Sequence, residues 1–167
     1  MFVGSIKTDF MQKVITFLWF KDTLAEEAVN FYVSVINGAK ITKIMRVGKA
    51  GPGPEGSVLT MEFEIGGQTF VALNGNPESK FTQAMSLMIN CDTQEEIDAY
   101  WEKLSAGGKK VQCGWLEDKY GVSWQIVTPL LLEMLNDKDA AKSERVMRAM
   151  MQMTKIEIAP LKKAYEG

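Results

Sequence analysis

The pattern of hydrophobic and polar positions predicts the same order of secondary-structure elements in each half of this chain. In each half, an apolar run typical of a strand precedes a segment with helical spacing, and three further strand-like runs follow. The helical segments span residues 22–38 and 92–108. The pattern predicts two βαβββ modules, at about residues 13–75 and 84–128. The strand-like runs are residues 14–20, 39–47, 57–65 and 68–74, then 84–91, 110–112, 113–117 and 122–128.

The two helical segments match one another when one is shifted by 70 positions. Each begins with a Thr-x-x-Glu spacing, which predicts a capping box: the threonine side chain accepts from the amide three residues on, and the glutamate reaches back. Each ends at glycine, which predicts a left-handed C-cap. Two such matches at one offset favour an internal duplication. The coincident pairs are Asp22/Asp92, Thr23/Thr93, Glu26/Glu96 and Gly38/Gly108.

Composition narrows the class of protein and of partner. The net charge is −2 and 46% of the residues are hydrophobic, values that are ordinary for a soluble domain. No long apolar stretch or run of like charges occurs, so we expect neither a membrane nor a nucleic-acid partner. The two cysteines do not form a disulfide framework, and a cytoplasmic location is expected. Residues 1–12 are predicted to be an N-terminal extension without the features of a signal peptide.

The chain contains no histidine, which restricts the chemistry available to an active site. Ser-His and Cys-His nucleophilic pairs are excluded, and a general base would have to be a carboxylate, Lys, Tyr or Cys. Cys113 therefore lacks the usual activating partner, and we expect a small buried hydrophobe rather than a nucleophile. Glu62 and Glu64 share one strand face, where acid–base work is possible, but exposure opposite the core is the favoured interpretation.

The stretch VQCGWLEDKYGVSWQIV, residues 111–127, predicts the last two strands of the second module and their hairpin. Trp115 and Trp124 lie on these adjacent strands, and we expect them to pair across the strands and serve packing. The charged residues at the turn are expected to be solvated. They are Glu117, Asp118 and Lys119.

Residues 129–167 are predicted to form a C-terminal helical tail. Pro129 is expected to end the sheet, and residues 139–153 have the spacing of a helix with an apolar stripe. We expect this helix to pack on its own sheet or on a second subunit. The stripe consists of Val146, Met147, Met150 and Met151.

Several segments, covering most of residues 14–128, resemble one known family. They are ITFLWF, AEEAVNFYVSV, GPGPEGSVLTMEFEIGGQTFVALNG, NCDTQEEIDAYWEKLSAGG and CGWLEDKYGVSWQIV. The likeness is to the PhnB-like family, which carries a demethylubiquinone methyltransferase domain name. This family falls within the vicinal-oxygen-chelate superfamily of glyoxalase I, bleomycin-resistance proteins and extradiol dioxygenases. The resemblance implies an α+β fold, in which two βαβββ modules form a curved, mostly antiparallel sheet around a cleft, plus C-terminal helices.

The resemblance also indicates where metal-dependent members hold their ligands. By motif, these positions fall near Phe17, Ala72, Ser86 and Gln125. Phe and Ala cannot bind a metal, and Ser and Gln are weak neutral ligands. We therefore expect no metal and no cofactor. Gln125 is expected either to contact a ligand or a cavity water, or to make a structural hydrogen bond.

Strand alternation then gives a predicted cleft lining with aromatic walls and scattered neutral polar groups. Phe17 and Trp19 also fit packed core positions. The mixture suits a small, partly apolar ligand, so we expect a metal-independent small-molecule-binding protein that forms a homodimer. The predicted lining residues are Phe17, Trp19, Phe70, Ala72, Asn74, Ser86, Met88, Ser123 and Gln125.

Two other functions stay open at this stage. One is an enzyme, either the methyltransferase of the family name or a lyase or isomerase. The other is a structural dimeric module whose cleft is filled by its own side chains. The loop GKAGPGPEG, residues 48–56, is expected to be a surface or interface loop, because two prolines stiffen it and a strand follows it.

Overall fold

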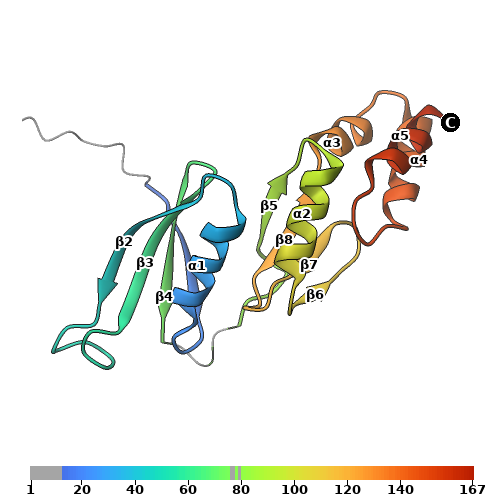
Figure 1. Ribbon diagram of the computed structural model, residues 1–167. Helices are drawn as coiled ribbons and strands as arrows, with labels where there is room; N and C mark the ends of the chain where they lie inside the picture. The colour runs from blue at the N-terminus through green and yellow to red at the C-terminus, as the bar shows by residue number, and fades with distance from the viewer. Residues whose placement is uncertain (1–12, 76–77, 79) are drawn as a thin grey trace, which may run out of the picture. The chain divides into compact units, whose positions relative to one another are not determined.

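The computed structural model describes residues 13–75, 78 and 80–167 of the chain (Figure 1). The N-terminal extension predicted for residues 1–12 lies outside the described residues. The chain divides into two units, Met1–Ser79 and Lys80–Gly167. Each unit contains one βαβββ module, and the second also contains the C-terminal tail. In the part of the chain that the structure describes, no helix is long and apolar enough to cross a membrane.

The first module forms a four-stranded sheet in the order β1-β4-β3-β2. β1 is parallel to β4, and the other neighbouring strands are antiparallel. The tight turn between β3 and β4 uses Gly66 and Gly67 at φ 56° and 78°, a left-handed conformation that glycine adopts without strain. The elements are β1 Thr16–Phe20, α1 Leu24–Val35, β2 Lys40–Arg46, β3 Val58–Ile65 and β4 Gln68–Asn74.

One face of this sheet packs against α1 and forms the core of the first unit. The ring of Tyr32 on α1 lies 6.3 Å from that of Phe63 on β3, and Phe63 stacks on Phe70 of β4 at 5.4 Å. Full burial of one such side chain contributes about 1.5–3 kcal/mol. The other fully or nearly fully buried residues here include Leu18, Phe20, Ala25, Ala28, Val29, Met61 and Ala72.

The second module repeats this arrangement with the sheet order β5-β8-β7-β6, again with one parallel pair, β5 with β8. Its core consists of α2 side chains such as Trp101 together with sheet residues such as Trp124 and Ile126. The predicted α+β class and the twofold βαβββ order are therefore confirmed. The elements are β5 Ser86–Asn90, α2 Gln94–Ser105, β6 Lys109–Lys110, β7 Trp115–Glu117 and β8 Ser123–Val127.

The two predicted capping boxes have different outcomes. At α2, the Glu96 amide donates to Thr93 Oγ1 at 3.2 Å, and the Glu96 carboxylate accepts from the Asp92 amide at 2.8 Å. At α1, the prediction is wrong, because the Thr23 side chain makes no capping hydrogen bond. Asn74, on β4, caps the helix instead, and its side-chain oxygen accepts from the Ala25 amide rather than from the predicted Glu26 amide. Local sequence spacing does not reveal such a substitute, because it comes from a distant strand.

The hairpin between β7 and β8 also departs from the prediction. Asp118 is buried, not solvated, because three hydrogen-bond donors of its own hairpin converge on its carboxylate. The two tryptophans do not pair: the register sets Trp115 opposite Gln125 and Leu116 opposite Trp124. A shift of one residue therefore sends the tryptophans to opposite faces of the sheet.

The C-terminal tail packs within the second unit, through α4 against α3 and α5. Pro129 does more than end the sheet, since it begins α3, where its missing amide hydrogen is not needed. Cys113, expected to be buried, is only partly so, and its amide donates to the tail at Met153 O over 2.8 Å. The tail helices are α3 Pro129–Leu135, α4 Ala140–Met150 and α5 Ile158–Glu166.

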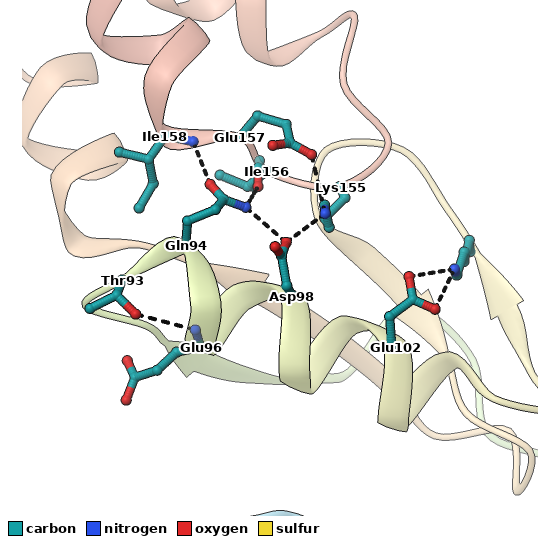
Figure 2. Close-up of polar contacts among 10 residues, drawn as sticks. Thr93, Gln94, Glu96, Asp98, Glu102, Lys155, Ile156, Glu157 and Ile158 are labelled. Atoms are coloured by element: carbon teal, nitrogen blue, oxygen red, sulfur yellow. Dashed lines mark hydrogen bonds and ion pairs between the residues drawn. The ribbon is translucent and has the colours of Figure 1, made fainter.

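A polar clamp on α2 holds the segment that leads into α5 (Figure 2). The Gln94 amide nitrogen donates to Ile156 O at 3.1 Å, and its oxygen accepts from the Ile158 amide at 2.8 Å. The Lys155 ammonium group bonds the carboxylate of Asp98, one turn further along α2. These contacts satisfy backbone groups at the start of α5 that no helix partner could reach.

Candidate ligand site in the first module

The sheet face opposite α1 carries two exposed aromatic side chains. Phe17 is 59% exposed and Trp19 is 46% exposed. The parallel register places Phe17 beside Val71 and Trp19 beside Leu73. Residues paired in this way point to the same side of a sheet, so these four share the open face.

The residues predicted to line a cleft in the first module consequently lie on two opposite faces of its sheet. Phe70 and Ala72 are buried under α1, at 4% and 0% exposure, and cannot line a surface together with Phe17 and Trp19. The prediction was wrong for these two residues because it shifted the fourth strand by one position, which exchanges the faces. Both faces of this strand are apolar, so its composition does not reveal the shift.

Asn74, the third predicted lining residue on β4, has a structural role at the end of the strand. Its side-chain oxygen accepts from the Ala25 amide at 2.8 Å, and its nitrogen donates to Val58 O at 3.0 Å. One amide group therefore joins the start of α1 to two strands. Asn74 also borders the hollow described next.

A cavity of about 320 Å³ lies within the first unit, at the end of the sheet where β1 leads into α1. Trp19 and Leu73 contribute from the open sheet face, and Asp22 and Thr23 contribute from the turn before α1. The β2–β3 loop, residues 47–57, provides much of the remaining lining, including Pro52 and Pro54. The surroundings are thus largely apolar, with a few polar groups at one side.

The β2–β3 loop is held in place by its own backbone bonds. The Val47 amide donates to Ser57 O at 2.8 Å, and the Gly56 amide donates to Val47 O at 2.8 Å. Val47 is buried, and a Cβ at Gly51 would lie only 2.5 Å from its side chain. The loop therefore forms an ordered wall of the cavity.

In the second module, the four predicted lining residues do share one face. The register pairs Ser86 with Ser123 and Met88 with Gln125, and Met88 is 49% exposed. The Gln125 amide donates to Ser86 Oγ at 2.9 Å, so Gln125 makes the structural hydrogen bond that was one of its two expected roles. The Ser123 hydroxyl is buried without a hydrogen-bond partner among the described residues. Ligand contact by this face stays a prediction.

A second hollow, of about 410 Å³, lies in the second unit between the starts of α2 and α5. Some of its polar groups serve the fold: Thr93 caps α2, and both ends of the Gln94 amide bond the tail (Figure 2). Glu157 at its rim also lies 3.2 Å from Lys155. The cavity of the first unit is the more enclosed of the two and has the more apolar lining.

Comparison with known proteins identifies the family. A sequence model of the 3-demethylubiquinone-9 3-methyltransferase family matches residues 12–127. The chain belongs to this family. A solved PhnB protein from Bacillus cereus is 42% identical, with a TM-score of 0.64, over 70% of this chain and 100% of that one. The predicted membership of the PhnB-like family is therefore confirmed.

Two more distant structures show the shared fold alone. A Pseudomonas aeruginosa protein is 18% identical, with a TM-score of 0.58, over 70% of this chain and 98% of that one. The fosfomycin resistance protein FosX of Listeria monocytogenes is 18% identical, with a TM-score of 0.51, over 77% and 99% of the two chains. No curated protein matches the sequence.

The metal positions of the wider superfamily do not carry metal-binding side chains in this family member. Phe17 has no donor atom, and the residue that shares its face on β4 is Val71 or Leu73, which are also apolar. Ser86 and Gln125 offer neutral groups that bond one another at 2.9 Å. Among the described residues, no three His, Cys, Asp or Glu side chains form a group that could hold a metal ion. This donor chemistry does not fit a divalent metal.

Proposed function

We propose that this protein binds a small, largely apolar molecule without a metal, in the cavity beside Trp19. The observation that carries the proposal is the cavity itself, about 320 Å³ in volume and lined mainly by apolar side chains. Ligand sites typically combine such a volume with an apolar lining and a few polar groups that fix orientation. Here the polar groups come from the turn before α1 and from the end of β4.

The exposure of Trp19 supports this proposal. An indole that is 46% exposed in the free protein gains burial when a ligand covers it. The ordered β2–β3 loop stands beside it, so little chain has to be immobilised on binding. A pre-formed wall and an exposed aromatic floor together favour a ligand that stacks on the ring.

A binding screen that uses thermal stabilisation of the full chain tests the proposal. Molecules that stabilise the wild-type protein in this screen are expected to bind the Trp19→Ala variant at least about tenfold more weakly, which corresponds to about 1.4 kcal/mol. Met147→Ala is the matched control, because Met147 is about equally exposed but lies on α4, outside the cavity. Ligands whose binding is unchanged by Trp19→Ala, or is abolished by Met147→Ala, would bind elsewhere.

The metal-free part of the proposal has a separate test. Nickel, zinc and manganese at micromolar concentration are expected to leave the unfolding temperature unchanged, because the available donors are weak and neutral. A stabilisation that chelation reverses would overturn this part. Ser86→Ala with Gln125→Leu would then show whether those two residues hold the ion.

The family name supports a second candidate, a methyltransferase. The glycine-rich loop of residues 48–56 joins two strands, whereas nucleotide-type loops lead from a strand into a helix. Calorimetry with S-adenosylmethionine at millimolar concentration decides between the candidates. Saturable heat that Trp19→Ala leaves intact would favour the methyltransferase over the proposed cavity binder.

The proposal includes a homodimer in the cytoplasm. Large apolar side chains such as Phe17 and Met88 are about half exposed on the open sheet faces, and a second copy would cover them. Both cysteines are free, as expected of a reducing compartment. Light scattering after size-exclusion chromatography should give twice the mass of 18.7 kDa. A single-chain mass at micromolar concentration would exclude the dimer.

A further inference from the structure

The cavity beside Trp19 has an electrostatic character that defines its ligand more narrowly. Among the described residues that line it, Asp22 is the one with an ionisable side chain, a carboxyl group. The other lining residues are apolar, glycine or neutral polar. An anionic ligand would therefore meet a carboxylate and no lining cation.

The existing partner of Asp22 is weak. Lys21 Nζ lies 3.9 Å from the Asp22 carboxylate, and the two side chains are 58% and 61% exposed. Exposed pairs of this kind contribute little to stability, so a cation bound in the cavity can replace Lys21 at small cost. Two other basic residues near the sheet are engaged elsewhere: Arg46 donates to Gly56 O, and Lys40 pairs with Glu64.

The start of α1 contributes a partial positive charge beside the cavity, because Thr23, the N-cap residue of the helix, is part of the lining. Two features offset it: the Asn74 oxygen accepts from the Ala25 amide at 2.8 Å, and Glu26 and Glu27 stand in the first turn. Carboxylates in the first turn counter the partial positive charge of a helix N-terminus. With Lys21 and Asp22 in the turn before α1, and Glu26 and Glu27 in the first turn of the helix, carboxylates outnumber cations at this corner of the unit.

Trp19 provides a second, independent attraction for a cation. Its ring lines the cavity and is 46% exposed, and no described residue accepts a hydrogen bond from its indole. Among aromatic side chains, tryptophan attracts a cation over its ring face most strongly, and aromatic side chains recognise quaternary ammonium ligands in this way. A carboxylate beside the ring adds the attraction of an opposite charge.

We propose that the cavity binds a small organic cation, an alkylated or protonated amine, between the Trp19 ring and the Asp22 carboxylate. This inference rests on the proposed function, since it assigns a ligand class to the same cavity. The apolar lining accommodates the alkyl groups, and Asp22 selects the positive charge.

Choline and 3,3-dimethyl-1-butanol test the inference with the full chain, because the two molecules share one shape and differ in charge. Titration by calorimetry and by ligand-observed NMR should show choline binding at least about tenfold more tightly than the alcohol, a difference of about 1.4 kcal/mol. Methylphosphonate is the anionic probe and should not bind. Trp19→Leu should weaken choline and the alcohol together.

Asp22→Asn isolates the charge. Asparagine suits this position because Asp22 has φ 50°, a left-handed conformation that Asn tolerates and most residues do not. The variant should lose most of the preference for choline over the alcohol, and the smaller contribution of the Trp19 ring should remain. Glu62→Gln is the matched control, since it removes a carboxylate from the open sheet face outside the cavity, and it should preserve the preference.

The outcomes separate this inference from the proposed function. Equal affinity of the wild-type protein for choline and the alcohol, or a preference that Asp22→Asn leaves undiminished, overturns the cation assignment alone. Tighter binding of methylphosphonate overturns it as well. Both the inference and the proposed function fail if none of these probes binds and if Trp19→Ala weakens the binding of no molecule found in the thermal-stabilisation screen.

Discussion

The Asp118 carboxylate accepts a hydrogen bond from the indole nitrogen of Trp124 at 2.9 Å. The same carboxylate accepts from the amides of Tyr120 and Val122 at 2.9 and 3.0 Å. Asp118 and Trp124 are 2% and 1% exposed. One side chain therefore joins the turn to the central strand of the second module by accepting three hydrogen bonds, two of them buried and one partly buried.

Asp118→Ala should destabilise the second unit strongly. The change leaves the Trp124 indole and two amides unsatisfied, and each loss of a bond to a charged group costs about 1.5–3 kcal/mol. We expect a total loss of at least about 3 kcal/mol in urea unfolding, given that such terms are not additive.

Glu117→Gln is the neighbouring control for Asp118→Ala. Glu117 is paired with Lys109 at 2.8 Å, but the lysine is 71% exposed, and such pairs contribute about 0–1 kcal/mol. Similar unfolding midpoints for the Asp118 and Glu117 variants would contradict the assigned role of Asp118.

Asn74 should prove to be a structural residue as well as a cavity neighbour. Asn74→Ala removes the cap of α1 and the bond to Val58, and a lost cap alone costs about 0.5–2 kcal/mol. Asn74→Asp keeps the acceptor for the Ala25 amide and should recover part of that loss. Asn90 ends β5 with an exposed side chain, so Asn90→Ala should change the free energy of unfolding by less than about 0.5 kcal/mol. Equal effects at the two asparagines would contradict this role.

The bond between Asp98 and Lys155 should make tail docking depend on pH. The hydrogen bond from Lys155 lowers the pKa of the Asp98 carboxyl below its usual value, assisted by Gln94. A carboxyl with a lowered folded-state pKa stabilises the folded state above its unfolded pKa of about 3.9, and this stabilisation is lost as the pH falls through the folded value. Docking of the segment before α5 should therefore weaken only in acid.

Asp98→Asn tests this dependence by urea unfolding between neutral pH and acid. The wild-type protein should exceed the variant by less than about 1 kcal/mol at pH 7, because the Asp98 side chain is 47% exposed, and the difference should vanish in acid. Glu144→Gln removes an exposed carboxylate paired within α4 and serves as the control. A difference that grows toward low pH would contradict the sign.

Cys91 should be inert to thiol reagents in the folded protein. Burial, reinforced by the carboxylates of Glu96 and Asp92, raises the pKa of its thiol to about 12. In Cys113→Ser, Cys91 is the remaining thiol, so a disulfide-exchange reagent at pH 8 should give no signal until denaturant is added. Prompt reaction of the native variant would show that the site opens locally.

Much of the local structure could be predicted from the chain alone. The helices α1 and α2 both run for 12 residues, and their starting residues, Leu24 and Gln94, are separated by the offset of the repeat. Hydrophobic periodicity and glycine positions are local signals, because they depend on neighbours a few residues away. The same signals located β4 at residues 68–74, with its turn at Gly66 and Gly67.

The candidate site was predicted only in part. Trp19 and Asn74 were both expected in the lining, and both border the cavity. Phe70 and Ala72 were placed on the wrong face, because a period of two says which residues share a face but not which face meets the helix. Asp22 was recognised as a member of the repeat, yet its place in the cavity depends on a loop more than 20 residues away.

The chain's own pattern established two duplicated modules, their helices and strands, and a family whose usual metal donors are missing here. Those properties follow from spacing and residue type, which are local. The tertiary structure decided that Asp118 is buried, that Asn74 caps α1, and that Trp19 and Asp22 border one cavity. Such facts depend on register and on which distant segments meet, and these are settled by the packing of the whole unit.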